Sequence, residues 1–145
     1  MKKNEKGFTL IELLAVIVIL AVIALIATPI VMNVINKSRQ KAAEDSAYGV
    51  IQAVKSKYAE LLIEKGDEMS EGIEADFGNN GAVTGVSGET VTVTGTKPSE
   101  GKIKITSDGI VTFPKSDGTA GGTIKINNYN CSITDNEVVE CKNAG

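Results

Sequence analysis

The chain has 145 residues, with 15 basic and 18 acidic side chains and no histidine. This length allows one modest domain, and a chain without histidine lacks the Ser-His-Asp and Cys-His arrangements of nucleophilic enzymes and the commonest metal ligand. Three lysines fall in the first seven residues, so the remainder is more acidic than the whole and is a poor general surface for nucleic acid. We therefore predict a protein that is not an enzyme and has no metal, no cofactor and no specific nucleic-acid partner.

The first long element is an apolar run from Leu13 to Asn36 that carries no charge. As a helix, a run of roughly 24 residues spans ~36 Å, enough to cross a hydrocarbon core of ~30 Å. We predict a transmembrane helix over residues 8–36, with Lys2, Lys3 and Lys6 holding the N-terminus in the cytoplasm and the rest of the chain outside. An ordinary signal anchor is the alternative, whereas a secretory signal peptide would have a shorter apolar region of about 7–15 residues.

Glu12 is the only charged residue between Lys6 and Lys37. A carboxylate near the centre of a bilayer costs ~2.5–3.5 kcal/mol on insertion scales, so an intramembrane acid indicates a functional site. An ordinary anchor does not explain this residue. The one cation that could reach it is a new amino terminus, created by cleavage nearby.

The run 7–14, GFTLIELL, resembles the class III signal of type IV pilins and the related pseudopilins. In that family a membrane aspartyl peptidase, the prepilin peptidase, removes a short basic leader after the glycine and the exposed phenylalanine is N-methylated. The resemblance implies a leader over residues 1–7, cleavage between Gly7 and Phe8, and methylation of the Phe8 amine. It also implies that Glu12 pairs with the Phe8 ammonium of a neighbouring subunit during filament assembly.

Pro29 lies about two-thirds along the apolar run, where its ring collides with the carbonyl of Leu25 and kinks or opens the helix. A simple kink is one interpretation. The resemblance implies another, a role in assembly, because pilins of this type loosen this segment in filaments. Many pilins carry a glycine shortly before the proline, where this chain has Ala21 and Val22.

The helix is predicted to continue over residues 37–65 as the amphipathic helix of an extracellular head, ending near Gly66. Its apolar positions recur at spacings of three and four and should pack on a sheet. They are Ala43, Ala47, Val50, Ile51, Val54, Tyr58, Leu61 and Leu62. Residues 66–88, rich in glycine and polar side chains, are predicted to be a surface connection with short local structure.

Residues 89–145 are predicted to form an antiparallel sheet and a disulfide-bounded tail. Alternating apolar and polar residues indicate strands at 90–94, 102–106, 110–113 and 123–127. Asp108-Gly109 is a hairpin signal between the second and third strands. The expected fold is α+β, with a long N-terminal helix packed on one antiparallel sheet of about four strands.

The tail contains the two cysteines of the chain, Cys131 and Cys141, on either side of a predicted turn at Asp135-Asn136. Two thiolates without histidine do not complete the usual four-ligand zinc site, and outside the membrane such a pair favours a disulfide that closes a hairpin. Free buried thiols are the alternative. Pilins commonly carry a disulfide-bounded C-terminal region exposed on the filament.

Together these features predict a structural subunit of an extracellular type IV pilus, anchored in the inner (cytoplasmic) membrane before assembly. Its expected partners are copies of itself in a helical homopolymer or mixed pilus, the prepilin peptidase, the pilus assembly machinery and the membrane. A pseudopilin of a type II secretion or competence system is the nearest alternative. A signal-anchored surface domain whose motif is coincidental is a third.

Overall fold

The computed structural model describes residues 7–134 and 137–145, so positions 1–6 of the predicted leader and the predicted turn at Asp135-Asn136 lie outside the described residues. The chain divides into two compact units, residues 1–38 and residues 39–145. Helix α1 (Leu10–Lys65) contributes to both units. We call residues 39–145 the head and describe it by itself.

The part of α1 within the head forms one wall of the core. It buries Ala43, Ala47, Val50, Ile51, Val54, Tyr58 and Leu61, as the spacing predicts, and leaves Leu62 partly exposed. Gly66 follows the last helical residue with a φ of +54°, a conformation that favours glycine at a helix end, and a single 3-10 turn (Gly66–Met69) continues from it. The predicted helix and its end at Gly66 are therefore confirmed.

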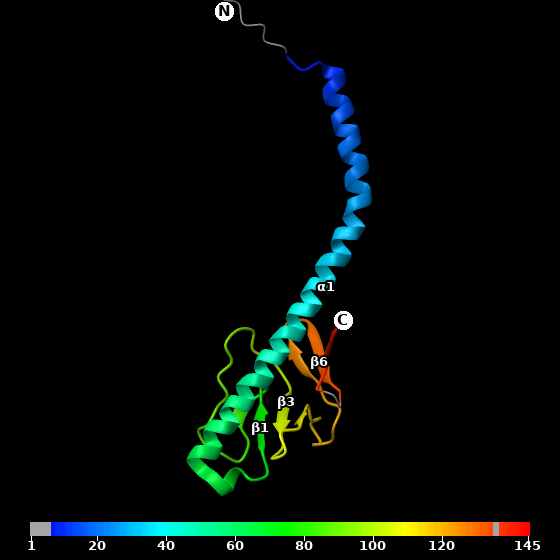
Figure 1. The fold of residues 1–145 in the computed structure, drawn as a ribbon. Helices are drawn as coiled ribbons and strands as arrows, with labels where there is room; N and C mark the ends of the chain where they lie inside the picture. The colour runs from blue at the N-terminus through cyan, green and yellow to red at the C-terminus, as the bar shows by residue number, and fades with distance from the viewer. Residues whose placement is uncertain (1–6, 135–136) are drawn as a thin grey trace, which may run out of the picture. The chain divides into compact units, whose positions relative to one another are not determined.

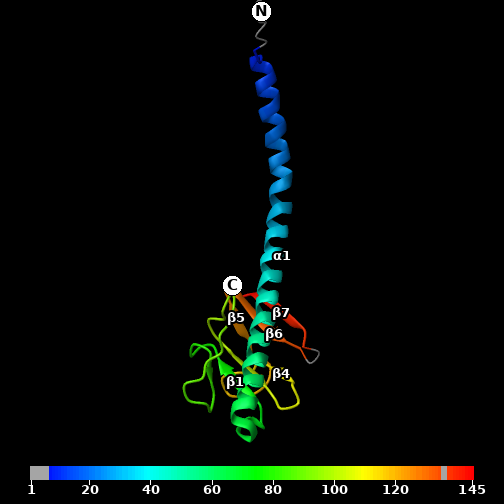
Figure 2. The same cartoon turned by 60° about the vertical axis from the view of Figure 1, so that its left-hand side comes forward.

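Two antiparallel sheets lie against this helix (Figures 1 and 2). The first has the strand order β2-β1-β3-β4. Its strands are β1 (Ile73–Asp76), β2 (Ala82–Val83), β3 (Lys102–Ile105) and β4 (Val111–Thr112). The second has the order β5-β6-β7. Its strands are β5 (Ile124–Ile126), β6 (Tyr129–Ile133) and β7 (Val139–Asn143). The predicted α+β class and the four-stranded antiparallel sheet are confirmed.

The strand predicted at 90–94 is wrong. Its described pairing is one isolated bridge, between Thr90 and Ala82, with the Val91 N–H donating to the Gly81 carbonyl. The place beside β3 is taken by β1 from the predicted connection 66–88. β1 buries Ile73 and Ala75 in the core. Its outer carboxylate Glu74 lies 3.0 Å from Lys102 Nζ on the neighbouring strand. Cross-strand burial combined with an opposite-charge pair favours β1 in this position.

The strand predicted at 123–127 forms, as β5, but it belongs to the second sheet rather than to the first. A tight turn at Asn127-Asn128, with Asn127 at a φ of +53°, places β5 directly beside β6. The C-terminal hairpin is therefore part of a three-stranded sheet. Both sheets contribute to one hydrophobic core with α1.

Candidate assembly site and disulfide-bounded surface

The N-terminal part of α1 exposes almost all of its apolar side chains. Phe8, just before the helix, is 86% exposed, and the leucines, isoleucines and valines from Leu10 to Ile35 are exposed as well. By length and composition, the helix is long and apolar enough to cross a membrane. A surface of this kind is stable only in lipid or against other apolar helices.

Thr9 and Glu12 form a reciprocal cap at the start of α1. The backbone N–H and the hydroxyl of Thr9 each donate to Glu12 Oε2 at 2.8 Å, and the Glu12 N–H donates to Thr9 Oγ1 at 3.3 Å. This is the capping-box pattern of a threonine followed three residues later by a glutamate. The expectation that only a new amino terminus could satisfy Glu12 is therefore incomplete, and the Thr-x-x-Glu spacing was the signal that could have shown it.

The cap leaves the charge of Glu12 without a cation among the described residues. Both of its partners are neutral hydrogen-bond donors, and the carboxylate is exposed. Gly7 and Phe8 directly precede the capping threonine, so an amine created at Phe8 would lie one residue before Thr9 and four residues before Glu12. The roles of Gly7, Phe8 and Glu12 in processing and assembly remain predictions.

Pro29 lies within a segment that is helical throughout. The hydroxyl of Thr28, immediately before it, donates to the carbonyl of Ala24 at 2.6 Å. Such back-bonding by threonine often bends helices, and the proline removes the next backbone hydrogen bond. The pair Thr28-Pro29 is thus a local weak point of the helix, and opening of this segment in a filament stays a prediction.

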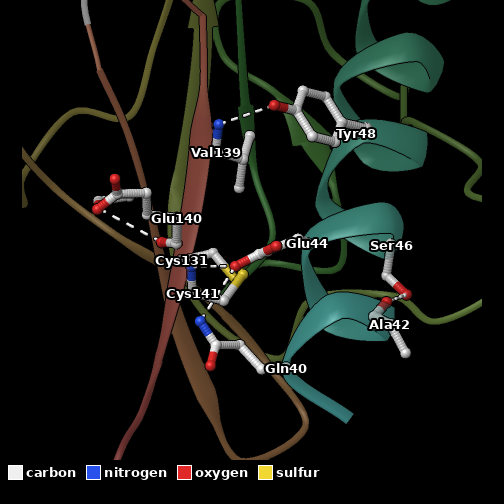
Figure 3. The surroundings of a disulfide bond; sticks show 10 residues. Gln40, Ala42, Glu44, Ser46, Tyr48, Cys131, Val139, Glu140 and Cys141 are labelled. Atoms are coloured by element: carbon white, nitrogen blue, oxygen red, sulfur yellow. Dashed lines mark hydrogen bonds between the residues drawn. A yellow bond between two sulfur atoms is a disulfide. The ribbon is translucent and has the colours of Figure 1, made fainter. Parts of the chain in front are cut away.

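The predicted disulfide between Cys131 and Cys141 is present, and free buried thiols are excluded (Figure 3). The two residues are directly opposite each other on β6 and β7, with their Cα atoms 4.0 Å apart. Both are fully buried. The bond therefore closes the hairpin from inside the core.

Side chains of α1 hold the outer edge of β7. The Tyr48 hydroxyl accepts a hydrogen bond from the Val139 N–H at 3.0 Å, and Glu44 Oε1 accepts one from the Cys141 N–H at 3.4 Å. Figure 3 shows Tyr48 and Glu44, one helical turn apart, pointing at the strand. Sequence reasoning missed these two residues, because only the fold brings positions more than 90 residues apart together.

Charged groups elsewhere in the head form ion pairs at its surface. Lys57 Nζ lies 2.7 Å from Glu89 and 2.9 Å from Glu60. These hydrogen bonds, first to Glu89 and then to Glu60, raise the pKa of Lys57, and the bond from Lys57 lowers the pKa of Glu89. Among residues 7–134 and 137–145, no three acidic or cysteine side chains are grouped so that they could hold a metal ion.

Comparisons with known proteins agree with this arrangement. A family described as the prokaryotic N-terminal methylation motif matches residues 2–28. The fimbrial protein EcpC of Eikenella corrodens is 33% identical over 107 residues, which cover 72% of this chain and 70% of that protein. No solved structure matches the chain. The motif matches the N-terminal segment, and the relative aligns over most of the chain, so the chain belongs to the type IV pilin-like family and is a pilin-type structural subunit.

Proposed function

We propose that this protein is a subunit of an extracellular type IV pilus, assembled through its N-terminal helix after cleavage between Gly7 and Phe8 and methylation of the Phe8 amine. The observation that carries the proposal is the methylation motif directly before an exposed apolar helix with one acid, Glu12, in its first turn. The fimbrial relative supports a pilin over a pseudopilin.

The exposed apolar surface of this helix supports assembly through it. In the membrane, lipid covers the apolar side chains of residues 8–36, and in a filament the same side chains pack against the helices of neighbouring subunits. Exchange of lipid for neighbouring apolar helices does not by itself fix the axial position of each subunit in the filament. A pairing between Glu12 of one subunit and the Phe8 ammonium of its neighbour would fix that position.

The proposed assembly route involves four partners, which are the membrane, the prepilin peptidase, the pilus assembly machinery and other copies of this chain. The subunit resides first as a single-pass protein of the cytoplasmic membrane with the head outside, and prepilin peptidase cuts it on the cytoplasmic side. The pilus assembly machinery then extracts it into the filament. Copies of this chain are the main partner there, in a homopolymer or a mixed pilus.

The test is the variant Glu12→Gln, because glutamine keeps the capping acceptor and removes the charge. We expect normal membrane insertion and cleavage but strongly reduced filaments. An ammonium left buried without its acid costs ~3–5 kcal/mol, which weakens subunit addition by more than about a hundredfold. Sheared surface filaments and processed membrane-bound subunit are compared in cells without the wild-type subunit.

Glu64→Gln, at an exposed position in the head, is the matched control and should assemble normally. A normal filament yield from Glu12→Gln would show that the charge of this residue does not guide assembly. A loss with Glu12→Ala but not with Glu12→Gln would assign the residue to helix capping alone.

A further inference from the structure

The outer edge of the first sheet lies in the segment that follows β2. The Val83 N–H donates to the Glu89 carbonyl at 2.9 Å, and the Val91 N–H donates to the Gly81 carbonyl at 2.8 Å. These two bonds flank the paired residues Ala82 and Thr90. The stretch 89–91 therefore pairs along the outer side of β2 and forms the outermost edge of the first sheet.

The backbone of this edge faces away from β2, and no partner for it is found in the described part of the chain. In an antiparallel ladder, the backbone N–H and C=O of a residue that lies between two such bonds point away from the neighbouring strand. Thr90 is such a residue, and because the direction alternates along a strand, the N–H and C=O of Thr92 point the same way. Within residues 7–134 and 137–145, neither Thr90 nor residues 92–96 make a backbone-to-backbone hydrogen bond. Figure 1 shows this stretch as a loop rather than as a strand arrow.

The side chains nevertheless alternate as in a strand. Val91 is buried and Val93 is half-buried against the core, whereas Thr90, Thr92 and Thr94 are exposed. Threonine and valine are residues that strands favour. The segment thus has the composition and burial of a strand but lacks one neighbour.

A groove of about 520 Å³ separates this edge from α1. The three threonines line it on the side of the edge, and α1 contributes three short residues and three longer ones, Gly49, Ala53, Ser56, Gln52, Lys57 and Glu60. Lys57, held by Glu60 and Glu89, lies at the groove. The lining of the groove is mainly polar, which suits the hydrogen-bonding groups of an extended peptide backbone.

The other sheet edges either have partners or are very short. Residues 99–100 pair with Lys125 on the outer side of β5, and Tyr48 and Glu44 hold β7. β4 has only two residues, and the next carbonyl, that of Phe113, accepts from the Gly122 N–H. Proteins protect edges in this way because an open edge pairs with other chains.

We propose that the edge at residues 90–94 is a strand-addition site that pairs with an extended segment of a second copy of this chain. The proposal rests on the proposed function, since a filament places copies side by side. Backbone pairing supplies the contact energy in strand addition. A contact between this edge and a different surface of the next copy is heterologous and generates a helical filament rather than a closed dimer.

Hydrogen exchange of the full-length protein tests the site directly. In detergent-solubilised subunit, the amides of residues 92–96 should exchange rapidly because they have no backbone partner. In assembled filaments we expect exchange in a peptide covering residues 90–96 to slow at least about tenfold. Equally fast exchange in filament and subunit would overturn the proposal, whereas failure of the wild type to form filaments would instead contradict the proposed function.

A matched pair of variants at Thr92 distinguishes the contribution of the backbone N–H to assembly from that of the side chain. Thr92→Pro removes an N–H that makes no bond in the subunit and blocks pairing, while Thr92→Ala keeps that N–H. We expect Thr92→Pro to reduce filament yield at least about tenfold and Thr92→Ala to assemble normally, with both keeping the wild-type thermal midpoint in detergent. Normal filaments from Thr92→Pro would overturn the proposal.

If Thr92→Pro lowers the thermal midpoint, the exchange measurement decides alone. A photo-crosslinker at Thr94 identifies the partner in the filament. Crosslinks to this chain support the proposal, and crosslinks only to a different protein overturn it.

Discussion

At the start of α1, the carboxylate of Glu12 is bound by Thr9 in the isolated subunit and is expected to bind an ammonium in the filament. The two arrangements are compatible, since a carboxylate offers two oxygens and about four lone-pair sites, and only Oε2 is used by Thr9. The cap holds the acid at a fixed place in the first turn of the helix, four residues after the predicted new amino terminus. A hydrogen-bonded acid also costs less to hold in lipid than a bare one.

Substitution of Gly7 should block processing. Gly7→Val adds a branched side chain next to the bond that the peptidase must bind, and we expect the uncleaved precursor to accumulate in the membrane. The measurement is the intact mass of the membrane-bound chain. Ala15→Val, which adds the same branched chain inside the apolar run, should be cleaved normally, and full cleavage of Gly7→Val would contradict the predicted role of this glycine.

Removal of the Tyr48 hydroxyl should destabilise the head modestly. Tyr48→Phe leaves the Val139 N–H of the edge strand without its acceptor, and loss of such a bond costs about 0.5–1.5 kcal/mol. Denaturant unfolding of the full-length protein in detergent measures the change in the free energy of unfolding. Tyr129→Phe is the control, because no hydrogen bond of its hydroxyl is found among the described residues, and an equal loss in both variants would contradict this contact.

At the scale of whole elements, the packed face of α1 should carry much of the stability of the head. Leu61 is fully buried, whereas Ile63, two residues later, is 87% exposed. We expect Leu61→Ala to lower the free energy of unfolding by about 2–5 kcal/mol and Ile63→Ala to change it by less than about 0.5 kcal/mol. Similar losses from the two variants in denaturant unfolding would show that this face does not pack as described.

The disulfide should stabilise the second sheet. It closes a loop with a sequence separation of 10 residues, for which the chain-entropy model gives about 3 kcal/mol. The double variant Cys131→Ala/Cys141→Ala should lose about that much free energy of unfolding, and reduction of the wild type should have a similar effect. Unchanged unfolding in both experiments would show that the bond contributes little.

The elements also show where sequence patterns suffice and where they do not. The helix, its end at Gly66, the β3–β4 hairpin and the disulfide follow local signals, and each is found. The run at 90–94 has a stronger strand composition than β1, yet β1 pairs with β3 because Ile73 and Ala75 fill the core there. Such competition depends on tertiary packing, which local propensity does not encode.

Some residues of the candidate site can be predicted from the local sequence, and others only from the fold. One local motif and one apolar run predict roles for Gly7, Phe8, Glu12 and Pro29, because the proposed processing and membrane insertion depend on the local sequence. Glu44 and Tyr48 become visible only in the fold, since their partners on β7 are distant in sequence. The role of Thr9 lay in a short local pattern that was overlooked.

For the whole molecule, an exposed apolar helix and a separate folded head suit a subunit that moves from a membrane into a filament. The buried core of the head contains no charged side chain among the described residues, and the ion pairs of the head lie toward its surface. In the proposed assembly the head would stay folded while the helix exchanges lipid for neighbouring helices. Export with an oxidised disulfide fits the same route, because the head is expected outside the cytoplasm.

The intact mass of the principal protein in sheared surface filaments tests the central claim most directly. The account predicts a chain that begins at Phe8, carries one added methyl group on its amine, and has Cys131 joined to Cys141. A filament subunit of this sequence that still begins at Met1, in cells with the peptidase, would contradict it.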